Sequence, residues 1–116
     1  MTVRVAVLAQ DLIWQDRLAR AVESAGATPS RAGTVSELDG ALADADRAIV
    51  DMTARGYDPL AAIGHARAAG ARVIAVGQHD DHDTRKRALA AGAERVYAYR
   101  KLFEDGPATL ATWLAS

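Results

Sequence analysis

Short apolar runs, separated by segments with helical patterning, are the feature that most limits what this chain can fold into. The clearest run is residues 48–50, which follows polar Asp46 and Arg47 and stops at Asp51. An uninterrupted apolar run of this length is typical of a strand that is covered on both faces of a parallel sheet. Asp51 is then expected at the carboxyl end of a central strand, where doubly wound sheets place their ligand crevice.

Four further strands and five helices are predicted from the same patterns. The predicted strands cover residues 3–9, 28–32, 47–51, 72–76 and 95–99. The predicted helices cover about residues 13–25, 35–43, 59–69, 82–91 and 107–114. The segment 28–32 is polar, which suits an edge strand that water can reach.

Capping residues support several of these boundaries. Thr34 and Glu37 have the spacing of a capping box, and Asp58 followed by Pro59 is typical of a helix start. Asp81 or Asp83 is expected to cap the fourth helix, which ends at Gly92.

Strands that alternate with helices at this spacing predict an α/β fold with one parallel sheet, because each parallel pair needs a right-handed crossover. We expect a flavodoxin-like, doubly wound, five-stranded parallel sheet in the order 2-1-3-4-5, with a helical layer on each face. In this arrangement the first and last helices cover the same face. Trp14 and Trp113 should therefore lie on the same side of the sheet.

Composition favours one domain spanning residues 1–116, since half of the 116 residues are apolar. The chain has no cysteine, which excludes disulfides and thiolate metal sites. No apolar run reaches the roughly 20 residues needed to cross a membrane, and the net charge of -1 gives no general attraction to nucleic acid. A cytoplasmic protein that binds neither membrane nor nucleic acid is expected.

Three segments together resemble the receiver domain of bacterial response regulators, over nearly the whole chain. They are residues 18–26 ending at Gly26, residues 49–52 containing Asp51, and residues 88–93 containing Gly92 and leading into Tyr97. The resemblance implies a place in two-component or phosphorelay signalling, with phosphoryl transfer to the position of Asp51. That chemistry needs a divalent cation such as Mg²⁺, held by oxygen ligands.

The positions that would hold the cation have changed. The acidic pair of the family falls on Ala9 and Gln10, which are a methyl group and a neutral amide. Asp11 stands one residue later, and a shifted loop would bring it into the crevice. The other interpretation of Asp11 is a solvated residue near the start of the first helix, where the helix dipole favours a carboxylate.

The remaining positions of the family's site have changed as well. Its hydroxyl at the end of the fourth strand matches Gly77, and its lysine at the end of the fifth strand matches Tyr99. Leu102 stands where the family's cis proline would be sought. Arg100 offers a guanidinium that could reach in and bind an oxyanion, one position out of register.

Asp51 alone is retained, and it has a structural alternative, which is to accept backbone hydrogen bonds from the loop that follows it. We therefore expect a pseudo-receiver that acts by protein–protein contact, without enzymatic activity and without a cofactor. One alternative is a working phosphoacceptor that uses Asp51 with Mg²⁺. The alternative from another class is a small-molecule-binding domain that uses the crevice above Ala9, Asp51 and Gly77.

A basic and aromatic face is predicted on the fourth helix, fifth strand and last helix. Tyr and Arg side chains are favoured at interface centres, and the family docks partners and second subunits on this face. A protein partner and a homodimer are both expected there, and a solvated charged face is the alternative. The predicted face comprises Arg85, Lys86, Tyr97, Tyr99 and Lys101.

Residues 79–83 are the one cluster with metal-ligand residue types. They carry His79 and His82 with three aspartates, and such residues can bind zinc or nickel. The alternative is that the carboxylates cap the fourth helix and balance the basic residues that follow. The alternative is preferred, so no metal site is predicted.

Overall fold

The computed structural model describes residues 3–78, 82–105 and 107–116, and its centre is one five-stranded sheet. All neighbouring strands are parallel, in the order β2-β1-β3-β4-β5. The strands are β1 (Arg4–Leu8), β2 (Thr28–Ala32), β3 (Arg47–Asp51), β4 (Arg72–Gly77) and β5 (Arg95–Ala98). The predicted fold class and strand order are confirmed, and β3 is the middle strand.

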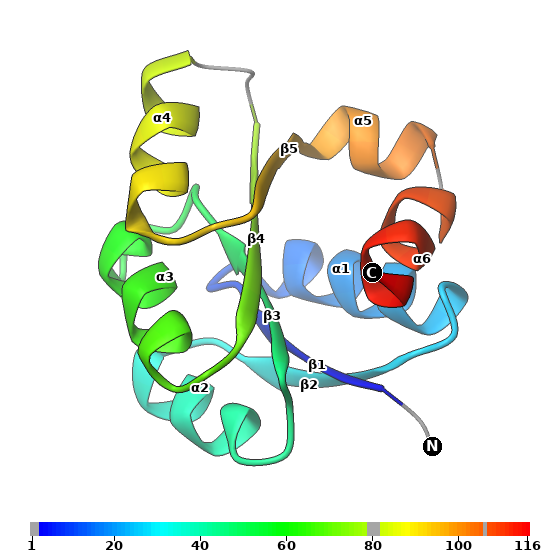
Figure 1. Ribbon diagram of the computed structural model, residues 1–116, viewed down its shortest axis with the longest axis horizontal. Coiled ribbons are helices and arrows are strands. Elements are labelled where there is room, and N and C mark those ends of the chain that lie inside the picture. Colours follow the sequence, from blue (N-terminus) through cyan, green and yellow to red (C-terminus); the bar gives the residue numbers. More distant parts are fainter. Residues whose placement is uncertain (1–2, 79–81, 106) are drawn as a thin grey trace.

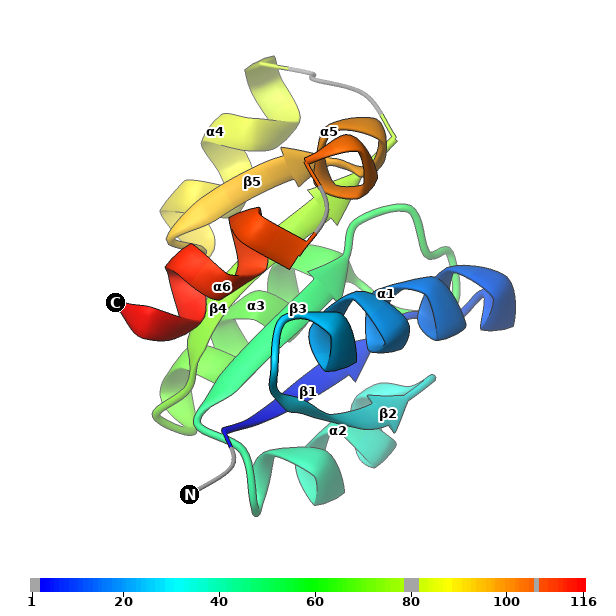
Figure 2. The same cartoon turned by 90° about the vertical axis from the view of Figure 1, so that its right-hand side faces the viewer.

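Helices cover both faces of the sheet, as Figure 1 shows. One layer consists of α2 (Val35–Leu42), α3 (Pro59–Ala68) and α4 (His82–Ala91). The other layer consists of α1 (Leu12–Ser24), α5 (Tyr99–Glu104) and α6 (Pro107–Ala115), which stand in front of the sheet in Figure 2. Within the described part of the chain, no helix is both long and apolar enough to cross a bilayer.

The two faces of the sheet have different cores. The face under α2, α3 and α4 is rich in alanine, with Leu8, Leu38 and Ile63 as its large buried side chains. The face under α1, α5 and α6 carries larger residues, and Trp113 is buried in it while Trp14 packs against it. The prediction that both tryptophans lie on one side of the sheet is confirmed. Trp14 stacks with Tyr99 and Phe103, whereas Trp113 lies with Arg72 and Glu94 near the start of β4.

The helix starts follow the predicted caps. Thr34 accepts from the Glu37 amide at 3.1 Å, and Glu37 accepts in return from the Gly33 amide at 3.1 Å. Asp58 accepts from the Leu60 amide at 3.0 Å. These bonds satisfy backbone donors that the first turn of a helix leaves free.

Two predictions about the end of the chain are wrong. Residue 99 is not in the fifth strand, because β5 ends at Ala98 and Tyr99 begins α5. The structure therefore has a sixth helix, which was not predicted, between β5 and the expected last helix. The apolar spacing of Tyr99, Leu102 and Phe103 fits one short amphipathic turn, and Tyr99 and Leu102 are buried.

Candidate functional site

Asp51 ends β3 and is completely buried. Its Oδ1 accepts from the Thr53 amide at 2.9 Å and from the Thr53 hydroxyl at 2.8 Å. The same hydroxyl lies 3.0 Å from Oδ2. The carboxylate thus holds the first turn of the loop after β3, which is the structural role foreseen for it, and a buried carboxylate needs such donors.

Tyr57 closes the other side of this loop. Its hydroxyl donates to the backbone carbonyl of Asp51 at 2.8 Å and lies 3.3 Å from the carbonyl of Leu8. Burial of the phenol, and then the negative charge of Asp51, raise the pKa of Tyr57 above its ordinary value. The ring therefore stays neutral and fixes the ends of β1 and β3 together.

Ala9 and Gln10, which stand at the positions of the family's acidic pair, make structural contacts here. Ala9 is completely buried in the core, so it offers the crevice only a methyl group. Gln10 uses its side-chain oxygen to accept from the amides of Arg55 at 3.1 Å and Gly56 at 2.9 Å. This oxygen is occupied by the loop after β3, where it ties that loop to the end of β1.

Asp11 is the N-cap of α1. Its Oδ1 accepts from the Ile13 amide at 2.8 Å and from the Trp14 amide at 3.3 Å. The interpretation of Asp11 as a helix-start residue is confirmed, and the shifted loop is not observed. The carboxylate still lines the pocket beside Asp51, but its bonds hold it to the helix.

Gly77 leaves an open position at the end of β4. A Cβ built there would meet Met52 at 3.7 Å, which is ordinary contact, so the backbone has room for a side chain that the sequence does not supply. Gly77 therefore offers no hydroxyl toward Asp51.

Tyr99 occupies the position of the family's lysine and fills the space with a ring. It is 3% exposed and stacks on Trp14, with ring centroids 4.2 Å apart. Burial and then the charge of Asp51 raise the pKa of the Tyr99 phenol. Its hydroxyl makes no hydrogen bond within the described residues. A neutral aromatic side chain thus replaces an ammonium beside Asp51.

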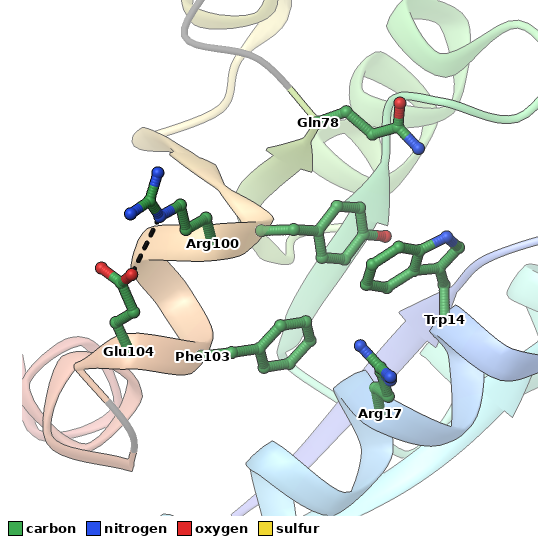
Figure 3. A pocket seen from close by; sticks show the side chains of 7 residues that line it. Trp14, Arg17, Gln78, Arg100, Phe103 and Glu104 are labelled. Atoms are coloured by element: carbon green, nitrogen blue, oxygen red, sulfur yellow. Dashed lines mark hydrogen bonds and ion pairs between the residues drawn. The ribbon is translucent and has the colours of Figure 1, made fainter.

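Arg100 does not reach into the crevice. It is exposed on α5, and its Nε donates to Glu104 at 2.9 Å along the same helix (Figure 3). The ion pair holds the guanidinium on the outside of the helix, one residue past the ring that faces the crevice. The proposed oxyanion role of Arg100 has no support in this geometry.

A pocket of about 380 Å³ lies over Asp51. It is lined by Gln10, Asp11, Trp14, Asp51, Thr53, Ala54, Arg55 and Gln78. Two carboxylates line it, and both accept hydrogen bonds from the chain. In the described ranges there is no group of three His, Cys, Asp or Glu side chains arranged to hold a metal. The residues present do not fit a resident Mg²⁺.

The predicted interaction face changes in composition. Tyr99 is removed from it, because the ring is buried against Trp14 instead of lying on the surface. Tyr97 is half-buried and lines a groove of about 440 Å³ with Lys101, beside α6. Arg85 and Lys86 lie on α4, on the other side of β5 (Figure 1). Helices α4 and α6 flank the exposed edge strand, as Figure 1 also shows.

The predicted metal-ligand cluster falls mainly outside the described residues, since His79, Asp80 and Asp81 are not among them. His82 and Asp83 begin α4. Asp83 is an acidic residue of the first turn, consistent with the preferred helix-start interpretation.

The structure brings together several residues that sequence reasoning missed. Thr53 and Tyr57 lie in a loop, and nothing in the pattern predicts that they bind Asp51 and its backbone. Trp14 and Phe103 both stack with Tyr99 although they lie 89 positions apart in the sequence. The one sequence signal for this cluster was the presence of aromatic residues at positions of the helices where polar residues are expected.

Comparisons with known proteins agree with this geometry. No protein-family model matches the chain, and no curated protein matches it in sequence. Solved structures do. A receiver domain of a DNA-binding response regulator from Colwellia psychrerythraea is 19% identical with a TM-score of 0.84, over 98% of this chain and 99% of that one. A response regulator from Thermotoga maritima is 21% identical with a TM-score of 0.80, over 99% and 96%.

The BeF3-activated receiver domain of DrrB, which is a Thermotoga maritima protein, is 14% identical with a TM-score of 0.82, over 99% of this chain and 96% of that one. At these identities the likeness concerns the fold. The receiver fold is therefore confirmed, and the chain spans it from end to end.

Proposed function

We propose that this chain is a receiver-fold signalling domain of the two-component type that works by protein–protein contact, without phosphorylation of Asp51. The supporting observation is that the Asp51 carboxylate is buried and already bound by both donors of Thr53. An incoming phosphoryl group on Oδ2 would have to compete with the Thr53 hydroxyl, which lies 3.0 Å from this oxygen. The alternative of a working phosphoacceptor requires that this hydroxyl gives way and that a cation site exists as well.

The electrostatics of the crevice support the same proposal. Phosphoryl transfer depends on positive charge that offsets the transferred group. Ala9 and Gln10 supply no charged ligand for a cation, and Tyr99 supplies a neutral ring where an ammonium would be needed. In this proposal the domain needs no Mg²⁺ and carries out no reaction of its own.

The partner is a protein that docks on the exposed edge around β5, with a second copy of the chain as the other candidate. Lys101, Tyr97 and Arg95 line the groove between β5 and α6, where they offer both cations and an aromatic ring. Exposed Lys86 on α4 adds positive charge on the other flank. An acidic partner surface matches this edge, and a cytoplasmic location follows from the proposed signalling role.

Treatment with acetyl phosphate and Mg²⁺, followed by intact mass measurement, tests the proposal. The wild-type protein should show no added phosphoryl group, and Asp51→Asn should behave in the same way. A mass increase of one phosphoryl group on the wild type that is lost in Asp51→Asn would overturn the proposal in favour of a working phosphoacceptor.

A further inference from the structure

A second cleft lies between α1 and α5, next to the pocket over Asp51 but distinct from it. It has a volume of about 560 Å³ and is largely apolar, with Trp14, Arg17, Gln78, Tyr99, Arg100, Phe103 and Glu104 around it (Figure 3). Ligand pockets of small molecules usually measure about 300 to 1,000 Å³ and are lined mainly by apolar and aromatic side chains. The volume of this cleft lies in that range and most of its lining surface is apolar, with polar side chains at its rim and a wide opening to solvent.

Three stacked aromatic rings form its wall, and the planes of Trp14 and Tyr99 are inclined by 27°. Trp14 and Phe103 are inclined by 8° with centroids 6.1 Å apart, and Tyr99 and Phe103 by 19° with centroids 5.7 Å apart. Trp14 and Phe103 are only half-buried, so both rings keep exposed surface. Aligned rings favour a planar aromatic guest, because offset stacking adds to the area that is buried.

The charge around the cleft is unequal. Arg100 is paired with Glu104, so these two residues offer no net charge. Arg17 lies with its guanidinium 5.2 Å from the Trp14 ring, and it forms no ion pair within the part of the chain that is described. A cation held on an aromatic face and left without a carboxylate favours an anionic group on the ligand.

The cleft also continues along α1. A smaller apolar hollow of about 370 Å³ adjoins it and shares Arg17 and Phe103 with it. Leu102, Ala21 and Pro107 line this extension. A fused or extended ring system can therefore lie along the groove while its acidic group stays at Arg17.

We infer that this cleft binds a small planar aromatic carboxylate, with its rings on Trp14 and Phe103 and its carboxylate on Arg17. This inference goes beyond protein–protein contact, because it gives the domain a soluble ligand. It does not depend on whether Asp51 accepts a phosphoryl group. It also moves the expected small-molecule site from the crevice above Ala9, Asp51 and Gly77 to the space beside α5. Tyr99 lines the cleft, and its phenol is also close enough to Asp51 to be influenced by the charge of that carboxylate.

Titration with 2-naphthoate, followed by proton–nitrogen correlation spectra, tests the inference. Saturable shifts are expected at the Trp14 indole and at the amides of Arg17, Tyr99 and Phe103. The neutral analogue 2-naphthamide should bind about tenfold more weakly, since it lacks the charge that Arg17 recognises.

Three variants make the test specific. Arg17→Gln, on the exposed side of α1, should weaken 2-naphthoate about tenfold or more and leave 2-naphthamide nearly unchanged. Phe103→Leu keeps an apolar side chain and should weaken both compounds. Arg4→Gln, at an exposed arginine at the start of β1, is the matched control and should change neither.

Several outcomes would overturn the inference. These are the absence of saturable shifts, equal affinity for the acid and the amide, or equal binding by wild type and Arg17→Gln. Tighter binding of an acidic tryptophan-containing peptide than of 2-naphthoate at the same residues would also overturn it, because a protein partner would then occupy the cleft. Circular dichroism of each variant establishes that the fold is kept, so a loss of binding reports on the cleft.

Discussion

The segments that follow β3 and β5 lie at the same edge of the sheet. They differ in whether their side chains bind to the chain itself or remain exposed to solvent. At the loop after β3, the Tyr57 hydroxyl, the Asp51 carboxylate at the end of β3 and the Gln10 amide oxygen from the end of β1 all bind groups of the chain itself. After β5, Tyr99 is buried with its phenol under the influence of Asp51, while the Trp14 and Phe103 rings beside it keep exposed surface. The first segment is closed on itself, and the second is open to a ligand.

The difference between the two segments indicates which part of the fold has surface available for binding another molecule. A carboxylate that is fully bound by its own loop contributes to stability, and any reaction there must first break those bonds. A half-exposed aromatic wall beside Arg17, which has no ion pair among the residues that the structure describes, has surface left to recognise another molecule. We therefore expect ligand binding at α5 and the residues around it, and not at Asp51.

The largest expected effect tests whether the ring of Tyr99 supports the open side. Tyr99→Ala should lower the free energy of unfolding by about 3 to 5 kcal/mol, because a buried aromatic ring is lost from the Trp14 stack. Tyr99→Phe should change it by less than about 1 kcal/mol, since the hydroxyl lacks a partner in the described residues. Urea unfolding measures both. Equal destabilisation by the two variants would show that the Tyr99 hydroxyl, and not its ring, provides the stabilising contribution.

The next effect concerns the closed side. Thr53→Val should lower the free energy of unfolding by about 1.5 to 3 kcal/mol, because the buried Asp51 carboxylate loses the hydroxyl donor and keeps only the amide. Thr112→Val, at an exposed position of α6, is the matched control and should cost less than about 0.5 kcal/mol. If the two variants behave alike in urea unfolding, the bonds around Asp51 do not stabilise the loop.

Alkaline pH sharpens the comparison, because Tyr57 and Tyr99 belong to opposite sides and both have a raised pKa. The unfolded phenols ionise near pH 10, while the native ones stay protonated. The contribution of these two phenols to stability should therefore be constant below about pH 10 and fall above it, by about 1 kcal/mol for each tyrosine between about pH 10 and 11. Tyr99→Phe should reduce this slope by about half. Urea unfolding across that range checks the sign, and a stability that rises with pH would contradict it.

The smallest effect concerns the link between β1 and the loop after β3. Gln10→Ala should cost about 0.5 to 1.5 kcal/mol, because water can replace the lost acceptor at exposed amides. Hydrogen exchange at the amides of Arg55 and Gly56 should accelerate. Gln78→Ala, at the rim of the aromatic cleft, should leave both amides as they are. Unchanged exchange in Gln10→Ala would show that the loop is held by other contacts.

Much of the fold follows from sequence because it rests on repeated local signals. Apolar runs, the Thr34 and Asp58 caps, and the glycines after three helices place most elements within a residue or two. The helix α5 was missed because Tyr99 fits a strand as well as a helix, and only its packing on Trp14 decides between them.

The candidate site was predicted only in part. The loss of charged groups at Ala9, Gln10 and Tyr99, and of a hydroxyl at Gly77, can be read directly from the sequence. The bonds from Thr53 and the aromatic cleft cannot, because they depend on contacts between segments that are distant in sequence or on loop conformation. The pair between His65 on α3 and Asp39 on α2 is a similar case, since its partners are 26 residues apart.

The most direct test of the account is a titration of the wild-type protein with beryllofluoride and Mg²⁺, observed at the backbone amides of Asp51, Met52 and Thr53. Beryllofluoride mimics a phosphoryl group on an aspartate and needs the same cation and donors. We expect no saturable shift of these three amide signals. Saturable shifts of all three would show that the carboxylate gives up Thr53 and takes a phosphoryl mimic, and would contradict the account.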